Sequence, residues 1–542
     1  MSEELRPAAT PRSAVLDPAH EGEIRGALGS IPSSDRGRPW SRRLLTLAAI
    51  MGPGLIVMIG DNDAGGVSTY AQAGQDYGTT LLWVLLLCIP TLIVAQEMVV
   101  RLGAVTGVGH ARLIKERFGR FWAAFSVGDL FLLNFLTLVT EFIGVDLSLR
   151  YFGVTPLASV PIVAIGLLAM VATGSFQLWE RFMFVFIVTS LLMFPLALLS
   201  HPSAEPVVKG LFVPTVQGGF TSTSVLFIIA VVGTTIAPWQ LFFQQSNVID
   251  KRITTRWLKY ELADTSIGAV VTTAGGGAIM LATAFAFAHT GLAGQFGSGL
   301  TVAEGLSRRV GSASGAIFAI VLVNASVIGA SAVTLSTSYA LGDSFGLKHS
   351  LHRKVGDAKG FYLSFAGLIA LAAGVVLIPR APLGLITTGV QVLAGVLLPS
   401  AIVFLLLLCN DAEVLGPWVN SARQNVVATI IVAVLVLLSL ILTVTTVIPE
   451  LPLGPFTAAV AIVAVFGLSW MGVAARRRRG RDQERERAVT GDRRAWRMPP
   501  LAELRPPVWS RAQRLGMLVL RGYLVLAVVL LAVKIGQLAL AR

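Results

Sequence analysis

The chain has 542 residues, of which 54% are hydrophobic and 13% charged, and its mean hydropathy is +0.74. A soluble chain of this length would carry far more charge and divide into several domains, so this composition excludes a water-soluble enzyme or scaffold. The formal net charge is +13, but the basic residues lie between apolar runs, which favours membrane topology over nucleic-acid binding. Cys88 and Cys409 both fall inside apolar runs and form neither a disulfide framework nor a metal–thiolate spacing.

Residues 1–40 are rich in Pro, Ser, Arg and Glu, and they predict a disordered cytoplasmic tail without a signal peptide. Beyond this tail, apolar runs of about 20 residues recur, which is the length that a helix needs to cross a bilayer core. The runs are too long and continuous for barrel strands. About thirteen membrane spans are therefore expected. They begin near Leu45, Thr79, Trp122, Val154, Leu178, Ser222, Ala263, Ala313, Phe361, Leu383, Val426, Phe456 and Gly516.

The spans divide the chain into parts. Residues 41–412 are expected to form a ten-helix core, 413–475 two accessory helices, 476–513 a basic cytoplasmic linker and 514–542 a further accessory helix. Alternate loops are rich in Lys and Arg, and four arginines follow one another from Arg476. This asymmetry favours a multi-pass plasma-membrane protein with a cytoplasmic N-terminus. The abundance of Ala, Gly, Val and Arg suggests a bacterial source.

Polar residues interrupt the first span. The stretch Asp61–Gly66 reads DNDAGG and places two carboxylates where the bilayer midplane is expected. An ionised carboxylate in hydrocarbon costs roughly 2.5–3.5 kcal/mol on insertion scales, which a bound cation would offset. We therefore expect Asp63 to bind a cation, and Asp61 to line or gate the cavity mouth or to cap a helix. Gly65 and Gly66 would permit the local unwinding.

Pro238 interrupts the sixth span, because proline lacks an N–H donor and cannot continue a regular helix. Breaks five spans apart are expected of a five-plus-five inverted repeat with a binding site at the midplane. Trp239 would shape or gate the cavity, although simple packing is an open alternative. Backbone carbonyl groups close to the two breaks would be additional cation ligands, namely those of Gly60, Ala64, Ile236 and Ala237.

Three further polar residues lie inside apolar spans. Gln240 and Gln391 would either bind the cation or form interhelical hydrogen bonds. Glu141 would be a proton or ion relay, or a packed residue bonded to a neighbour. Apart from Met58, no His, Cys or Met stands at the breaks. Hard oxygen ligands suit Mg²⁺, Ca²⁺ or Mn²⁺ better than Fe²⁺, Zn²⁺ or Cu⁺.

This sequence resembles the Nramp family of divalent-metal transporters. The first span of that family is similar to Gly52-Pro53-Gly54, Asp63-x-Gly65, Gln72-Ala73-Gly74 and Tyr77-Gly78, and the loop after its second span is similar to Arg101–Gly107. The resemblance extends over about residues 45–410. It implies an all-α polytopic membrane protein of LeuT-like fold, with two inverted five-helix repeats and broken helices 1 and 6. Two or three C-terminal helices would be additional.

The resemblance places Asp63 on the family's metal-binding aspartate and Gln391 on a glutamine that helps to bind metal. Other positions depart from the family pattern. Ala64 replaces its Pro, Gly66 replaces its metal-binding Asn, and Ala237-Pro238-Trp239 replaces Met-Pro-His. Leu138 stands where one of two relay carboxylates is expected, so that only Glu141 remains. These losses are similar to those of Nramp-related magnesium transporters, whose wider site is thought to accept partly hydrated Mg²⁺ without proton coupling.

We therefore expect a secondary transporter that takes up Mg²⁺, and also Mn²⁺, by alternating access driven by the membrane potential. A proton-coupled Mn²⁺/Fe²⁺ symporter remains an alternative because Glu141 is present. A cation channel, a sensor that transports nothing and an organic-solute carrier are alternatives of other classes. No nucleophile–base set or phosphate loop indicates an enzyme. The expected partners are the metal ion and the bilayer, with no cofactor, nucleic acid or obligate protein partner.

Overall fold

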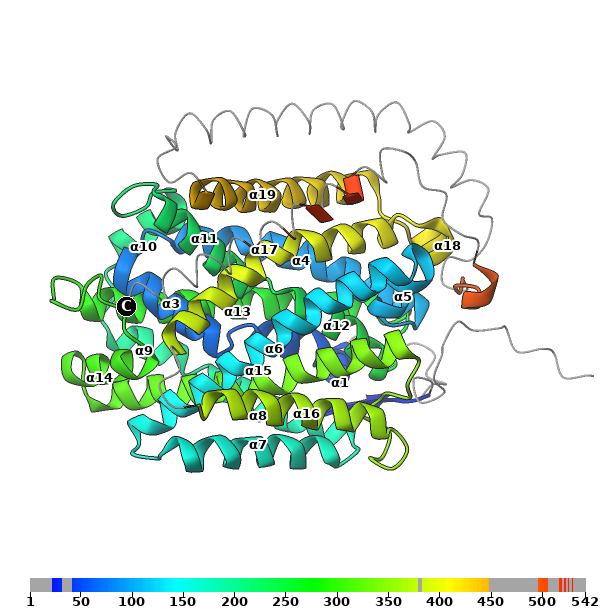
Figure 1. The fold of residues 1–542 in the computed structure, drawn as a ribbon, viewed down its shortest axis with the longest axis horizontal. Coiled ribbons are helices and arrows are strands. Elements are labelled where there is room, and N and C mark those ends of the chain that lie inside the picture. Colours follow the sequence, from blue (N-terminus) through cyan, green and yellow to red (C-terminus); the bar gives the residue numbers. More distant parts are fainter. Residues whose placement is uncertain are drawn as a thin grey trace, which may run out of the picture.

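The computed structural model describes residues 22–31, 41–378, 383–447 and 496–504, together with 516–518, 521, 522, 525 and 529. Within these residues the structure is almost entirely helical (Figure 1), and the strands form one short hairpin. Eight described helical segments are long and apolar enough to cross a membrane, and a bent pair of helices raises this number to nine. The polytopic architecture expected from the apolar runs is therefore present.

The hairpin consists of β1 (Ile24–Gly26) and β2 (Gly29–Ile31). The helices of the first half are α1 (Ser41–Ile50), α2 (Pro53–Gly60), α3 (Ala64–Tyr77), α4 (Leu82–Thr106), α5 (His110–Phe118), α6 (Arg120–Tyr151), α7 (Pro156–Ala172), α8 (Phe176–Ser190), α9 (Met193–Leu199) and α10 (Ala204–Phe212). The later helices are α11 (Ser222–Thr235), α12 (Pro238–Asp250), α13 (Leu258–Phe287), α14 (Gly299–Arg309), α15 (Ser312–Phe345), α16 (Lys359–Val376), α17 (Leu383–Cys409), α18 (Ala412–Leu415) and α19 (Ala422–Val447), with short 3₁₀ turns at Gly416–Trp418 and Leu501–Glu503.

The interrupted helices lie at the centre of the bundle. Helix α13 packs against α2, α3 and α4, helix α15 against α6, and helix α11 against α17. The span made of α11 and α12 is almost wholly buried by its neighbours. In contrast, α7, α8 and α16 expose large apolar side chains such as Ile162, Val185 and Leu363, and α7 and α16 lie at one edge of the bundle (Figure 1). An apolar rim around a polar centre is expected of a protein surrounded by lipid.

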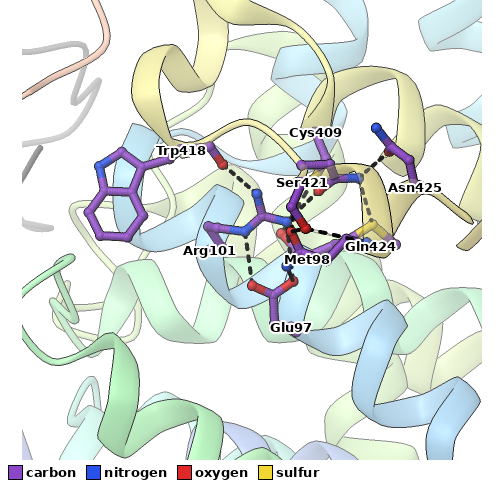
Figure 2. A network of polar contacts seen from close by, with 9 residues as sticks. Glu97, Met98, Arg101, Cys409, Trp418, Ser421, Gln424 and Asn425 are labelled. Carbon is purple, nitrogen blue, oxygen red and sulfur yellow. Dashed lines mark hydrogen bonds and ion pairs between the residues drawn. The ribbon is translucent and has the colours of Figure 1, made fainter. Parts of the chain in front are cut away.

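A buried polar network fastens α4 to the connection between α17 and α19 (Figure 2). Arg101 pairs with Glu97 at 3.0 Å and donates hydrogen bonds to the carbonyl of Trp418 and to the side chain of Asn420. The sequence suggested that Arg101 belongs to a loop, but it lies within α4, which continues to Thr106 and ends at a left-handed Gly107. The charge is tolerated there because its donors have acceptors.

One part of the predicted domain division needs correction. Residues 22–31 of the predicted disordered tail fold as the hairpin, because Ile24 and Ile31 bury their side chains against Ala49 and Ile50 of α1. Within the predicted linker, residues 496–504 are described, and the Trp496 ring packs against Gly416. The predicted span near Phe456 and residues 476–495 lie outside the described residues, and only short pieces of the last predicted helix are described.

Candidate functional site

The first break separates α2, which ends at Gly60, from α3, which begins at Ala64. Asp63 is the N-cap residue of α3, and its Oδ1 accepts the N–H of Gly66 at 2.6 Å. Aspartate is favoured at an N-cap because its carboxylate accepts free N–H groups and faces the positive end of the helix dipole. The capping bond therefore fixes the orientation of the carboxylate that the sequence singled out as a cation ligand.

The second break separates α11, which ends at Thr235, from α12, which begins at Pro238. Ile236 and Ala237 between them have non-helical backbone angles. Proline is well suited to the first position of a helix, where its missing N–H would have no partner. The Ala237 carbonyl accepts the N–H of Gln240 at 3.2 Å. The C-terminal ends of α2 and α11 carry the partial negative charge that favours a cation.

Two glycines at the start of α3 make room for polar groups from other helices. A Cβ on Gly65 would lie 1.8 Å from the amide nitrogen of Gln391 and 3.3 Å from Asp63 Oδ1. A Cβ on Gly66 would lie 2.9 Å from the Asp61 carbonyl oxygen and 3.0 Å from Thr234 Oγ1. The structure therefore brings α3, α11 and α17 together around Asp63, and Gly65 and Gly66 allow a close approach as well as a break.

Several of the buried polar atoms without a hydrogen-bond partner lie at the same place, and others lie elsewhere among the described helices. Among the described residues, those at this place include both carboxylate oxygens of Asp61, both amide atoms of Gln240, Nε2 of Gln391, Oγ1 of Thr234 and Nε1 of Trp239, and the Gln240 amide faces Asp61 without closing a full hydrogen bond. Buried polar groups in folded proteins are nearly always satisfied, so an unpartnered group calls for a bound species. A cation with part of its water shell would supply partners to oxygen atoms directly and to N–H groups through water.

Glu141 of α6 lies directly beside the aspartate. Its Oε2 accepts the N–H of Ala64 at 3.1 Å, and its carboxyl group faces the Asp63 carboxyl group within hydrogen-bonding reach. A Cβ on Gly329 of α15 would lie 2.7 Å from Glu141 Oε2 and 2.9 Å from Asp63 Cβ, so all three residues are neighbours. The bond to Ala64 agrees with the interpretation of Glu141 as a packed residue, and its position beside Asp63 keeps the relay interpretation open.

Trp239 forms a wall of the site. It is fully buried, its ring atom Cη2 lies 3.4 Å from where a Cβ on Gly60 would be, and its carbonyl accepts the hydroxyl of Ser336 at 3.0 Å. The side chain therefore packs against the end of α2, next to the first break. These contacts show packing, and a role in shaping or gating a cavity stays a prediction.

Sequence reasoning missed Thr234 and Gly329. Thr234 directly precedes the second break, and its hydroxyl could have been noticed there. Gly329 gave no signal, since glycine is common in membrane helices. Among the described His, Cys, Asp and Glu residues, no group of three could hold a metal ion. Any cation at the breaks would depend on amide, carbonyl and water oxygens beside carboxylates.

Comparisons with known proteins agree with this architecture. A family model described as Nramp, natural resistance-associated macrophage protein-like, matches residues 54–445. The divalent metal cation transporter MntH of Bacillus subtilis is 26% identical over 455 residues, which cover 80% of this chain and 96% of that protein. MntH of Klebsiella pneumoniae is 27% identical over 414 residues, covering 72% and 92%.

A manganese transporter of Eremococcus coleocola has a similar structure. Its TM-score is 0.64 at 19% sequence identity, over 84% of this chain and 98% of that one. At this identity the likeness shows the fold alone. The expected all-helical, LeuT-like membrane fold is confirmed.

Proposed function

We propose that this chain, which belongs to the Nramp family, carries divalent metal ions across a membrane by alternating access, with Mg²⁺ as its main cargo and Mn²⁺ as a second. Two of its relatives are named divalent metal cation transporters, and a protein of the same fold is a manganese transporter. Alternating access fits a site at two broken helices.

The single observation that carries the proposal is the set of unpartnered buried oxygen atoms beside Asp63, where the two broken helices meet. We assign direct binding of the cation to the Asp63 carboxylate. Gln240, Gln391 and the backbone carbonyl groups at the C-terminal ends of α2 and α11 would complete a partly hydrated shell. Mg²⁺ usually keeps several waters and takes only one or two carboxylates.

The second break carries no sulfur ligand, which supports a hard cation, while the sulfur atoms near the first break, those of Cys88 and Met193, lie beside Asp61 and Asn62. Ala237 stands where a thioether ligand would be needed, and its small side chain leaves space for water. Met58, the nearest methionine in sequence, has its Cβ and Cγ 2.8 Å from where a Cβ on Gly268 of α13 would be. Its side chain is thus packed against α13. Soft transition metals lose their advantage over abundant hard ions when no thioether is available.

The membrane potential alone would suffice to drive uptake. Moving two charges inward at 100 mV is worth ~4.6 kcal/mol, twice the value for one charge. This corresponds to a gradient of roughly three orders of magnitude. A proton-coupled Mn²⁺/Fe²⁺ symporter is the second candidate, favoured by one observation: Glu141 contacts the backbone next to Asp63.

Uptake into proteoliposomes tests both candidates. Mg²⁺, Mn²⁺, Ca²⁺ and Fe²⁺ would be compared under an inside-negative potential with an internal pH dye, in the wild type, Asp63→Ala and the control Asp357→Asn. Asp357 is exposed and far in sequence from both breaks. We expect saturable Mg²⁺ entry without acidification, lost only in Asp63→Ala. Uptake of Mn²⁺ or Fe²⁺ alone, with acidification, would establish the symporter instead.

A further inference from the structure

The first span has a second interruption, at Met51 and Gly52, which the sequence did not predict. Helices α1 and α2 meet there at an angle of 50°. Gly52 has φ +149°, which is a backbone conformation that side-chain-bearing residues rarely adopt, and a Cβ on it would lie 2.0 Å from Glu180 Oε1. The bend therefore requires glycine at residue 52 for two reasons: its backbone conformation, and the Glu180 carboxylate that lies where a side chain would be.

Charged side chains from three other elements hold this bend. Lys251 Nζ donates to the Met51 carbonyl and to Glu180 Oε1, both at 2.6 Å, and neither charged side chain is exposed. Asp264 Oδ2 accepts the N–H groups of Gly52 and Gly54 at 3.0 and 2.8 Å. Asp264 thereby caps α2. Polar contacts thus join one point of the first span to α8, to α13 and to the residue after α12.

The N-terminal hairpin completes the cluster. The N–H of Ala27 donates to Glu180 Oε2, the oxygen that Lys251 does not bind. Gln177 Nε2 donates to the Gly26 carbonyl at 3.1 Å. A Cβ on Gly26 would lie 2.2 Å from the Ala49 carbonyl, so the hairpin backbone rests directly on α1. One oxygen of the buried Glu180 carboxylate therefore binds the hairpin, and the other binds Lys251 at the bend.

We infer that the hairpin and the Glu180–Lys251 pair, together with the Asp264 cap, form a latch that holds α1 and α2 against α8 and α13. This latch must release before the site opens toward the side of the N-terminus. The inference rests on the proposed transport function only because it assumes that the site opens toward this side. It does not depend on which ion is carried. The α1–α2 segment lies in the chain directly between the hairpin and Asp61, so moving it away from α13 would uncover the site from this side.

The cluster contains an alternative partner for the released lysine. Glu261 of α13 is buried close to Lys251, Asp264 and the Gln244 amide, and no ion pair between Glu261 and a basic side chain is formed among the described residues. Breaking a buried ion pair leaves an uncompensated charge in the protein interior, which strongly destabilises the structure. Lys251 therefore needs a second acceptor nearby if the latch is to open and close reversibly. Lys251 would pair with Glu180 in the latched state and with Glu261 in the released state.

Thiol labelling at residue 265 tests the latch. Thr265 of α13 is buried under α2, and a Cβ on Gly54 would lie 2.6 Å from its backbone nitrogen. A Thr265→Cys variant, made with Cys88→Ala and Cys409→Ala, would be treated with a membrane-impermeant thiol reagent from the side of the N-terminus. Deletion of residues 1–31 and, separately, Glu180→Gln should each raise the labelling rate about tenfold, equivalent to about 1.4 kcal/mol. Arg25→Gln, on the exposed face of the hairpin, should leave the rate unchanged.

Gel filtration and thermal unfolding in detergent would identify variants that do not fold, and the hairpin deletion tests the latch even if Glu180→Gln is one of them. Unchanged labelling in a folded deletion variant would overturn the inference. Labelling does not require transport, so faster labelling in a protein that takes up no Mg²⁺ would support the latch while contradicting the proposed cargo.

Discussion

Gly65 of α3 and Gln391 of α17 are packed so closely that the amide nitrogen of Gln391 lies 1.8 Å from the position that a Cβ on residue 65 would take. No side chain fits at residue 65 unless the amide moves. The glycine thus determines where a side chain more than 300 residues later in the chain lies, beside the Asp63 carboxylate.

Gly65→Ala should therefore displace Gln391 from the site. We expect metal uptake to fall at least about tenfold, mainly through a higher KM, because a lost ligand contact weakens binding by about 1.4 kcal/mol or more. Gly128→Ala is the matched control, since Gly128 lies in α6 with open space around its Cα. Equal uptake by the two variants would show that Gln391 does not contribute to binding.

Glu141→Gln separates the two interpretations of Glu141. The glutamine oxygen can still accept the N–H of Ala64, so the start of α3 should keep its position. If transport is uncoupled, uptake should remain within about threefold of wild type, a change of less than 1 kcal/mol, with no change of internal pH. If Glu141 is a proton relay, the substitution should abolish an acidification that the wild type shows. Glu141→Ala should impair uptake in either case, because it leaves the Ala64 N–H without its acceptor.

The sequence predicted those features that break a local rule. Asp63 and Pro238 stand out because a carboxylate and a proline are unfavourable inside an apolar helix, and the structure places them at the ends of α3 and α12. The remaining polar groups obey local rules and gave no such signal. Threonine and glycine are ordinary residues of membrane helices, which is why Thr234 and Gly329 were missed.

Tertiary pairing explains the other differences. Lys251 and Glu180 are 71 positions apart and meet only through the packing of α8 against the first span, so neither residue predicted the bend at Gly52. Arg101 was assigned to a loop because a charge usually marks the end of a span. Besides Glu97, its acceptors come from more than 300 residues later in the chain, and they allow the helix to continue past it.

The loop after α15 predicts a pH dependence of stability. His349 Nε2 lies 3.1 Å from Asp343 Oδ1, and Nδ1 lies 2.7 Å from the Leu347 carbonyl, so both nitrogens face acceptors. Burial lowers the pKa of His349, but the hydrogen bond and charge of Asp343 outweigh burial and raise this pKa to about 9. Both acceptors are satisfied only by the protonated ring.

A pKa raised by folding means that protonated His349 stabilises the native state. This stabilisation should be complete below about pH 6.5, the unperturbed value for histidine, and should be lost as the pH rises through about 9. The free energy of unfolding of the wild type should exceed that of His349→Gln by ~3–4 kcal/mol at low pH, at 1.36 kcal/mol per pKa unit. Thermal unfolding in detergent between pH 6 and 10 measures the difference, and a constant difference across this range would contradict the assignment.

The Arg101 network predicts a large difference between two arginines that both form ion pairs within a helix turn. Arg101 pairs with Glu97 and is buried, whereas Arg112 pairs with Glu116 at 2.7 Å and is partly exposed. Arg101→Gln would leave the Trp418 carbonyl without this donor and Glu97 without its counterion, so we expect a loss of ~2–4 kcal/mol, toward the value for breaking buried pairs. Arg112→Gln should cost only ~0.3–0.5 kcal/mol, as exposed pairs do.

Unfolding in detergent would measure the loss of stability in both variants. Faster proteolysis of the segment 416–421 in Arg101→Gln alone would show that the connection to α19 has come loose. Equal losses in the two variants would mean that the network does not hold the accessory helix to α4.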